Sequence, residues 1–93
     1  MIKDFGDKKT ECIFNQEYVK GLPSEIQPRA LSKLRLIDAA TGLDDLKLPP
    51  SNGLHPLSKK LKDFHAIKIN KQWRIIFIWN AGGAEKVEIT DYH

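Results

Sequence analysis

The sequence predicts an α+β fold in which a short first strand precedes two main helices packed on a curved, mostly antiparallel sheet. Two observations support this prediction. Between residues 8 and 42, apolar residues recur at helical spacing. From residue 54 onward, apolar and polar residues alternate in runs separated by turn residues, as is typical of strands. The chain has 93 residues, 41% of them hydrophobic, which predicts one domain over 1–93 with a single core.

The N-terminal part is expected to hold the first strand and the first helix. Ile2–Phe5 alternates apolar and polar residues and is predicted to be an edge or end strand. Asp7 is a suitable cap for a helix that begins near Lys8 and that Gly21 stops. The apolar positions that predict this helix are Cys12, Ile13, Tyr18 and Val19.

The main packing helix is predicted to start between Pro23 and Pro28 and to end at Gly42. Ser24–Gln27 has capping-box spacing, but Pro28 removes an early backbone donor, so the start is not fixed more closely. Leu43–Leu46 is expected to form one more turn. The residues predicted to face the sheet are Ile26, Ala30, Leu31, Leu34, Ile37 and Thr41.

The second half is predicted to form the sheet. Pro56 confines the strand that begins at His55 to an edge or a bulge. Trp73, Phe77 and Trp79 alternate with Arg74 and are predicted to be core residues on the opposite face, and His65 is expected to be partly buried. The remaining predicted elements are a turn at Lys59–Lys62, a strand at Phe64–Ile69, a tight turn at Asn70–Lys71, a strand at Gln72–Trp79, a turn at Ala81–Gly83 and a strand at Lys86–Thr90.

The basic residues are concentrated in one segment. The net charge is +3, but residues 53–80 contain six basic side chains and one acidic side chain, a net +5, which leaves −2 for the remainder. A basic surface of this kind attracts a polyanion by releasing counterions. From charge alone, a solvated lysine loop is an equally good interpretation.

The cysteine content and the hydropathy exclude several classes. Cys12 is the sole cysteine, so no internal disulfide and no metal-binding cysteine pair can form, and a thiol enzyme is not expected. The N-terminus lacks the apolar core of a signal peptide, and no apolar run approaches the length of a membrane span. The sequence therefore predicts a cytoplasmic protein.

Several polar residues near strand ends suit metal-independent RNA cleavage. In that reaction a base takes a proton from the 2′-hydroxyl, an acid protonates the leaving 5′-oxygen, and a cation neutralises the phosphate. His55 and His93 can serve either proton role, and Arg74 offers a planar fork for phosphate oxygens. Tyr92 could orient the phosphate or stack on a base, and Asp91 could fix a histidine tautomer.

Each of these residues also has a structural interpretation. His55 could be a hydrogen-bonded strand histidine, and Arg74 could form an internal salt bridge instead of an anion site. His93 is the last residue in the sequence, and chain ends are usually without function.

The motifs together resemble the HigB toxins of bacterial toxin-antitoxin pairs, which belong to the RelE/ParE superfamily. The resemblance covers the whole chain. It is carried by Leu54–Leu57, Phe64, Trp73–Ile75 with Phe77, and Asp91–His93, and also by Met1–Lys3, Gly21–Pro23, Ala39–Thr41 and Asp45–Leu46.

The resemblance implies a RelE-like fold and a ribosome-dependent endoribonuclease that cuts mRNA in the decoding site without a cofactor or metal. The implied partners are the ribosome, mRNA, and a helix-turn-helix HigA-type antitoxin through which operator DNA is bound indirectly. The implied active-site residues are His55, Arg74, Asp91, Tyr92 and His93, and the basic turns with Lys59, Lys60, Lys62 and Lys71 are expected to bind RNA.

The chain departs from the family pattern at Ser58, where HigB toxins commonly have a lysine. Lys59 or Lys60 is expected to supply that charge through a small change in the turn. Two other interpretations remain: a ParE-like gyrase poison of the same fold, and a small adaptor that binds nucleic acid or an acidic partner.

Overall fold

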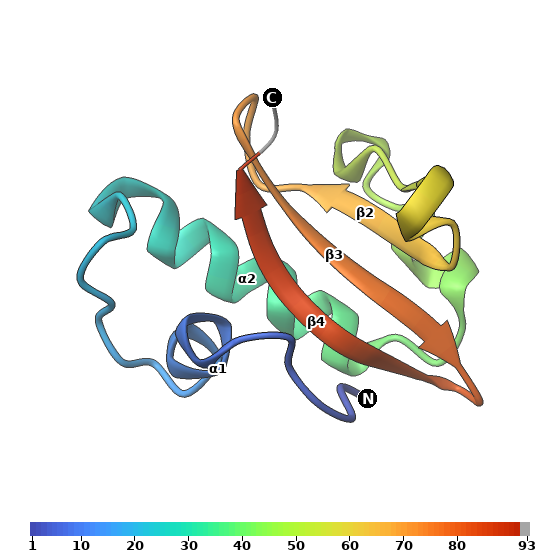
Figure 1. The fold of residues 1–93 in the computed structure, drawn as a ribbon, viewed down its shortest axis with the longest axis horizontal. Helices are drawn as coiled ribbons and strands as arrows, with labels where there is room; N and C mark the ends of the chain where they lie inside the picture. The colour runs from blue at the N-terminus through green and yellow to red at the C-terminus, as the bar shows by residue number, and fades with distance from the viewer. Residues whose placement is uncertain (92–93) are drawn as a thin grey trace.

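The computed structural model describes residues 1–91, and over these residues it shows a curved antiparallel sheet of four strands in the order β1-β2-β3-β4 (Figure 1). Helix α2 lies along one face of the sheet, and helix α1 lies beside β4 (Figure 1). This architecture confirms the predicted α+β fold. The elements are α1 (Lys8–Phe14), α2 (Gln27–Ala39), β1 (His55–Pro56), β2 (Phe64–Lys68), β3 (Trp73–Asn80) and β4 (Gly83–Asp91).

The N-terminal segment lies at the edge of the sheet, where the first strand was predicted. Isolated parallel bridges join Ile2 to Ala84 and Phe5 to Val87 on β4. The backbone N–H of Lys3 donates to the carbonyl of Ala84 at 2.7 Å. The segment therefore extends the sheet beyond β4, although its pairing is limited to these bridges.

Helix α1 begins as predicted and ends earlier. The Asp7 carboxylate accepts a hydrogen bond from the backbone N–H of Thr10 at 2.9 Å, which confirms the predicted cap. The helix ends at Phe14, so the predicted extension to Gly21 is wrong. Gln16 adopts a left-handed conformation with φ 65°, which a continuing helix does not allow.

A buried glutamine explains why the segment after α1 is not helical. The Gln27 side chain accepts from the N–H of Val19 at 3.0 Å and donates to the carbonyl of Val19 at 2.8 Å. It also donates to the carbonyl of Leu22 at 3.1 Å. Val19 is buried outside any helix, whereas Tyr18 is 72% exposed. The apolar spacing that predicted a longer helix therefore does not come from a helix. Val19 is apolar because it is buried in the segment between α1 and α2.

Helix α2 starts within the predicted interval. A 3₁₀ turn over Ser24–Ile26 leads into it, and α2 begins at Gln27. Pro28 lies in the first turn, where an amide N–H would have no helical partner in any case. Four residues of the predicted stripe are 1% exposed or less: Ile26, Ala30, Leu34 and Ile37.

The end of α2 lies earlier than predicted, at Ala39 rather than Gly42. Thr41 is exposed, so its predicted place in the buried stripe is wrong. The Asp45 carboxylate accepts from the N–H of Thr41 at 2.8 Å and from its hydroxyl at 3.0 Å. These hydrogen bonds lower the pKa of Asp45 and give the Thr41 amide a partner outside the helix. The predicted further turn is present as a 3₁₀ helix at Leu43–Lys47.

Alternate residues of the strands face opposite sides of the sheet. On the side covered by the helices, Ile67 and Ile75 pair across β2 and β3, and Phe77 is fully buried. Trp73 and Trp79 are partly buried against this core, as predicted. We call the other side the open face. It carries one row of cross-strand neighbours formed by His55, Ala66, Ile76 and Glu88, and a second formed by Lys68, Arg74 and Thr90.

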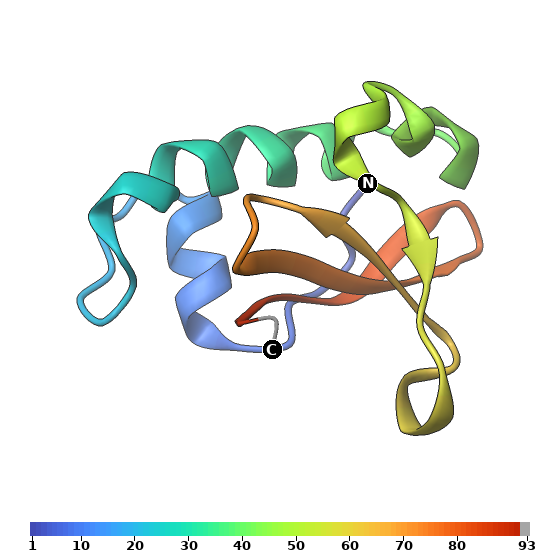
Figure 2. The ribbon, with the colours of Figure 1, turned by 90° about the horizontal axis from the view of Figure 1, so that it is seen from above.

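The connection between β1 and β2 is basic and lies beside the open face. Strand β1 is at the sheet edge, as Pro56 predicted, and Lys59–Leu61 forms a 3₁₀ turn. We call residues Lys59–Lys62 the lysine loop. It projects from the sheet on the side away from α2 (Figure 2). The open face therefore has a basic rim along one side.

The hairpin between β2 and β3 is one residue longer than predicted. The N–H of Ile69 donates to the carbonyl of Trp73 at 2.9 Å, which leaves three residues in the loop. The Asn70 side-chain oxygen accepts from the N–H of Gln72 at 2.8 Å and from that of Trp73 at 2.7 Å. As a result Lys68 pairs with Arg74. A two-residue loop would have paired Lys68 with Trp73.

Candidate functional site

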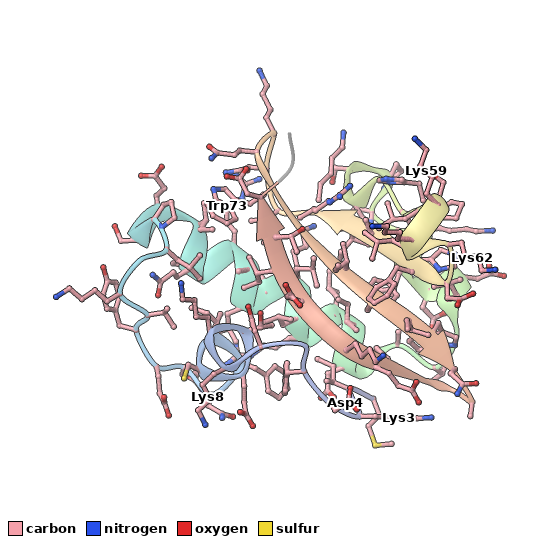
Figure 3. All side chains as sticks on the ribbon, viewed as in Figure 1. Lys3, Asp4, Lys8, Lys59, Lys62 and Trp73 are labelled. Carbon is pink, nitrogen blue, oxygen red and sulfur yellow. The ribbon has the colours of Figure 1, made fainter. Side chains whose placement is uncertain are left out.

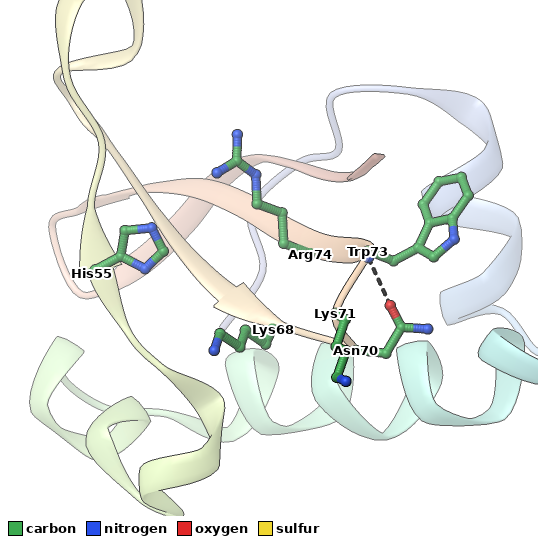
Figure 4. A pocket seen from close by; sticks show the side chains of 6 residues that line it. All are labelled: His55, Lys68, Asn70, Lys71, Trp73 and Arg74. Carbon is green, nitrogen blue, oxygen red and sulfur yellow. Dashed lines mark hydrogen bonds between the residues drawn. The ribbon is translucent and has the colours of Figure 1, made fainter. Parts of the chain in front are cut away.

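A basic hollow lies where β1 and β2 meet the start of β3. Its volume is about 290 Å³. Figure 4 shows its lining side chains, among which those of His55 and Arg74 come from strands distant in the sequence. The full lining is His55, Lys68, Asn70, Lys71, Trp73 and Arg74. The hollow thus combines an imidazole, a guanidinium and two ammonium groups.

His55 is held in one orientation by the backbone. Its Nδ1 atom lies 2.8 Å from the carbonyl oxygen of Gly53, which can only accept, so Nδ1 carries a proton in this contact. In the neutral ring Nε2 is therefore the atom able to take up a proton. Gly53 has φ 58°, and the Lys68 side chain packs within 3.2 Å of where a Cβ on Gly53 would lie. A larger residue at position 53 would therefore be strained and would crowd the Lys68 side chain that lines the hollow.

Arg74 is half-buried and anchored to β4. Its Nε atom donates to the Thr90 hydroxyl at 3.4 Å. Lys68 lies directly opposite on β2, so two cations are neighbours on the open face. Both side chains line the hollow, and a concentration of positive charge attracts anions. The pairing favours binding of a group such as a phosphate.

The predicted RNA-binding lysines divide into two groups. Lys71 lines the hollow. Lys59, Lys60 and Lys62 are exposed on the lysine loop and do not line it; Figure 3 shows Lys59 and Lys62 on that loop. Ser58, where a lysine was expected, precedes the loop and is also exposed. Lys59 or Lys60 as its substitute stays a prediction.

The C-terminal site residues are described only in part. Asp91 is the last residue of β4 and pairs with Trp73, next to the Arg74–Thr90 pair. Its carboxylate accepts from the Gln72 side chain at 3.3 Å. The predicted roles of Tyr92 and His93 fall on residues outside those that the structure describes.

Sequence reasoning missed Lys68 and Asn70 as lining residues. Lys68 was recognised only as part of the basic segment, because its position opposite Arg74 depends on the length of the hairpin loop. Asn70 was recognised only as a turn residue. Its side chain sets that loop length by accepting two backbone hydrogen bonds. An asparagine at the start of a hairpin loop was the available signal.

His65 lies on the helix side of the sheet, behind the hollow. Its ring stacks on Phe77 with centroids 6.3 Å apart, and it is partly buried as predicted. Burial, and to a smaller extent the nearby His55, lowers the pKa of His65. This histidine is therefore neutral near pH 7 and belongs to the core packing.

Other chemistries find little support in the described part of the chain. A hydrogen bond with Glu17 and partial burial raise the pKa of Cys12, which keeps the thiol protonated at neutral pH. Among residues 1–91, no three or more His, Cys, Asp or Glu side chains are grouped to hold a metal ion. None of the helices within 1–91 is both long and apolar enough to cross a membrane.

A small α+β fold of this topology, with a basic hollow on the open face, defines the class of RelE-like toxins. Residues 3–93 match a family model described as the RelE-like toxin of the type II toxin-antitoxin system HigB. The chain belongs to the HigB-like toxin family. It is the toxin of a type II toxin-antitoxin system, a class that acts together with an antitoxin partner.

Similar proteins agree with this assignment. The chain is 38% identical over 85 residues to Toxin HigB-1 of Vibrio cholerae serotype O1, covering 90% of each sequence. It is 31% identical over 93 residues to Endoribonuclease HigB of Proteus vulgaris, covering 100% of both. A conserved hypothetical protein of Helicobacter pylori has a similar solution structure, with a TM-score of 0.59, 16% identity, and coverage of 99% of this chain and 96% of that one. This last likeness concerns the fold alone.

Proposed function

We propose that this toxin is a metal-independent endoribonuclease that cleaves mRNA on the ribosome by attack of a 2′-hydroxyl on the adjacent phosphate. The observation that carries the proposal is the presence of His55 and Arg74 in one hollow. A relative that covers the full length of the chain is named an endoribonuclease. Cleavage of translated mRNA stops protein synthesis and growth, and it takes place in the cytoplasm, where ribosomes work.

The residues of the hollow have distinct roles in this mechanism. Arg74 and Lys68 neutralise the charge that grows on the phosphate as the 2′-oxygen attacks. His55, with its Nδ1 proton directed at Gly53, presents Nε2 for proton transfer. We assign the second proton transfer, and contacts that orient the phosphate, to the C-terminal residues Asp91, Tyr92 and His93. The attack forms a 2′,3′-cyclic phosphate and releases a 5′-hydroxyl end.

Dependence on the ribosome follows from weak RNA binding by a shallow site. The basic side chains of the open face attract RNA without selecting a conformation. Docking of the lysine loop and Lys71 on ribosomal RNA would bring the hollow to a message that the decoding site holds in a splayed conformation. Purified protein is expected to cleave translated message much faster than naked RNA, and equal rates would exclude this step.

The antitoxin is proposed to be a helix-turn-helix protein of the HigA type that inhibits the toxin by binding it. Such an antitoxin binds its own operator DNA, so the toxin meets that DNA only through its partner. Co-expression with the neighbouring antitoxin should restore growth, and the purified complex should bind the operator while the toxin alone does not.

The test of the nuclease function compares variants in growing cells. Expression of the wild type should arrest growth and generate new 5′ ends in translated messages. Arg74→Ala and His55→Ala should each reduce cleavage by at least about 100-fold, because each removes a group that acts on the transition state. Arg35→Ala is the matched control, since it removes an exposed arginine from α2 on the other side of the sheet. Full toxicity of both site variants would contradict the proposal and favour a toxin that acts by protein binding.

A further inference from the structure

A groove lies on the open face next to the basic hollow. Its volume is about 560 Å³, and it lies between the lysine loop and the N-terminal segment. Its apolar lining comes from Phe5, Leu61, Phe64 and Ile76, and Gly6 lies on the N-terminal side. The charged lining residues are Asp4, Lys86 and Glu88, the last two on β4. None of the roles proposed above uses this groove.

The groove and the hollow lie on the same face of the sheet and share a row of cross-strand neighbours. His55, Ala66, Ile76 and Glu88 are successive neighbours in one cross-strand row. Three strand spacings separate the first from the last, roughly 14–15 Å. Arg74 is two residues from Ile76 on β3, about 7 Å along the strand. A nucleotide adjacent to a phosphate held by Arg74 can therefore reach the groove with its base.

The lining of the groove has the chemistry of a base-binding site. An aromatic ring beside aliphatic side chains is the surface on which unstacked RNA bases are commonly held. Phe64 is half-buried, so part of the side chain is accessible. The lysine loop borders the groove through Leu61, and its charges favour an RNA strand over an uncharged peptide.

Glu88 supplies a hydrogen-bond acceptor at the end of this lining. Within residues 1–91, no hydrogen bond or ion pair engages its carboxylate. An ideal Cβ on Gly6 would lie 2.6 Å from Glu88 Oε1, so only a glycine leaves the carboxylate its place. Burial, and then the charge of Asp7, raises the pKa of Glu88, as expected for a carboxyl group without a compensating donor.

We propose that this groove binds an RNA base next to the scissile phosphate and that Glu88 selects bases that carry an exocyclic amino group. This inference rests on the proposed function. A carboxylate accepts hydrogen bonds from the amino group of adenine, cytosine or guanine. Uracil has a carbonyl oxygen where cytosine carries its amino group, and its one donor on that edge, N3–H, lies between two carbonyl oxygens that repel a carboxylate. Uracil is therefore disfavoured at one position near the cut.

The test is a cleavage assay on ribosomes translating a message library in which the bases around a cut site are randomised. Sequencing of the 5′ ends should show that the wild type avoids uracil at one fixed position by about tenfold, as expected when a buried polar group is left unpaired. Glu88→Gln should remove most of this bias, because an amide also donates to a uracil carbonyl. Glu25→Gln is the matched control, since it alters an exposed glutamate before α2.

A second variant separates base stacking from base selection. Phe64→Ala should lower cleavage about tenfold at all sites, because stacking on an aromatic ring is tolerant of sequence. Circular dichroism and a urea midpoint near that of the wild type establish that each variant is folded. A wild type that cuts with no uracil bias, or a bias unchanged by Glu88→Gln, overturns the base site alone. A wild type that cuts no RNA overturns the proposed nuclease function as well.

Discussion

The two faces of the sheet are built from the same strands and have opposite chemistry. On β3, Ile75 and Phe77 face the helices and are fully buried, whereas Arg74 and Ile76 face the open side. On β2, Ile67 faces the helices and Lys68 faces the open side. Because successive side chains of a strand point to opposite faces, the buried apolar residues that stabilise the fold lie on one face and the charged residues lie on the other.

This difference shows how a small domain can maintain a charged site. Lys68 and Arg74 place two positive charges at paired positions of β2 and β3, while the buried side chains of the helix face hold these strands together. We therefore expect substitutions on the helix face to change stability and substitutions on the open face to change activity. The following predictions test that division, from the largest expected effect to the smallest.

Phe77→Ala should have the largest effect on folding. It removes a fully buried aromatic ring from the centre of the helix face, which costs about 3–5 kcal/mol. Urea unfolding followed by circular dichroism measures the loss. Arg74→Ala, three residues away on the open face of the same strand, should cost less than about 1 kcal/mol. Equal losses for the two variants would contradict the division between the faces.

Gln27→Ala should come next, with a loss of about 2–3 kcal/mol. The side chain satisfies the buried N–H and carbonyl of Val19, and its removal leaves them without partners. The segment between α1 and α2 should then exchange its amide hydrogens faster. Glu25→Ala changes an exposed residue nearby and should leave both measurements unaltered. Slow exchange at Val19 in the Gln27 variant would show that other contacts hold the segment.

Asp7→Ala should lower the free energy of unfolding by about 1 kcal/mol. The carboxylate caps α1 through the N–H of Thr10, and loss of such a cap has a cost of this size. Asp7→Asn keeps a capping oxygen and should be close to the wild type. If the asparagine variant is as unstable as the alanine variant, the charge of Asp7 matters more than its hydrogen bond.

His65 should give a small pH dependence to stability. Its pKa is lowered in the folded protein below its ordinary value of 6.5, so the unfolded chain binds a proton more readily. Stability from this group is therefore complete above about pH 6.5 and falls as the pH drops from that value toward the lower folded pKa. Urea midpoints at pH 7.5 and 5.5 should differ less in His65→Phe than in the wild type. An unchanged difference would assign the effect to other groups.

The sequence predicted the sheet and the core of α2 because their apolar patterns are regular. It failed where a side chain provides a partner for the backbone. The Gln27 side chain bonds to the backbone of the segment that was predicted to extend α1, and the Asp45 carboxylate accepts a hydrogen bond from the Thr41 N–H. The Asn70 side chain accepts a hydrogen bond from the Trp73 N–H in a hairpin loop that is one residue longer than predicted. Such hydrogen bonds between side chains and the backbone cannot be predicted from the spacing of apolar residues.

The candidate site was predictable to a similar degree. His55 and Arg74 were identified from residue type and position, and both line the hollow. Lys68 and Asn70 were not identified, because their place depends on the pairing register. Asp91 lies beside Trp73, and the roles of Asp91, Tyr92 and His93 stay predictions.

The most direct test of the central claim is the single-turnover cleavage rate on ribosomes programmed with a message that carries a 2′-deoxynucleotide at the cut site. The wild-type toxin is expected to cut the all-ribose message and to leave the substituted one intact at that position, because the attacking hydroxyl is absent. Cleavage of both messages at the same rate would contradict it.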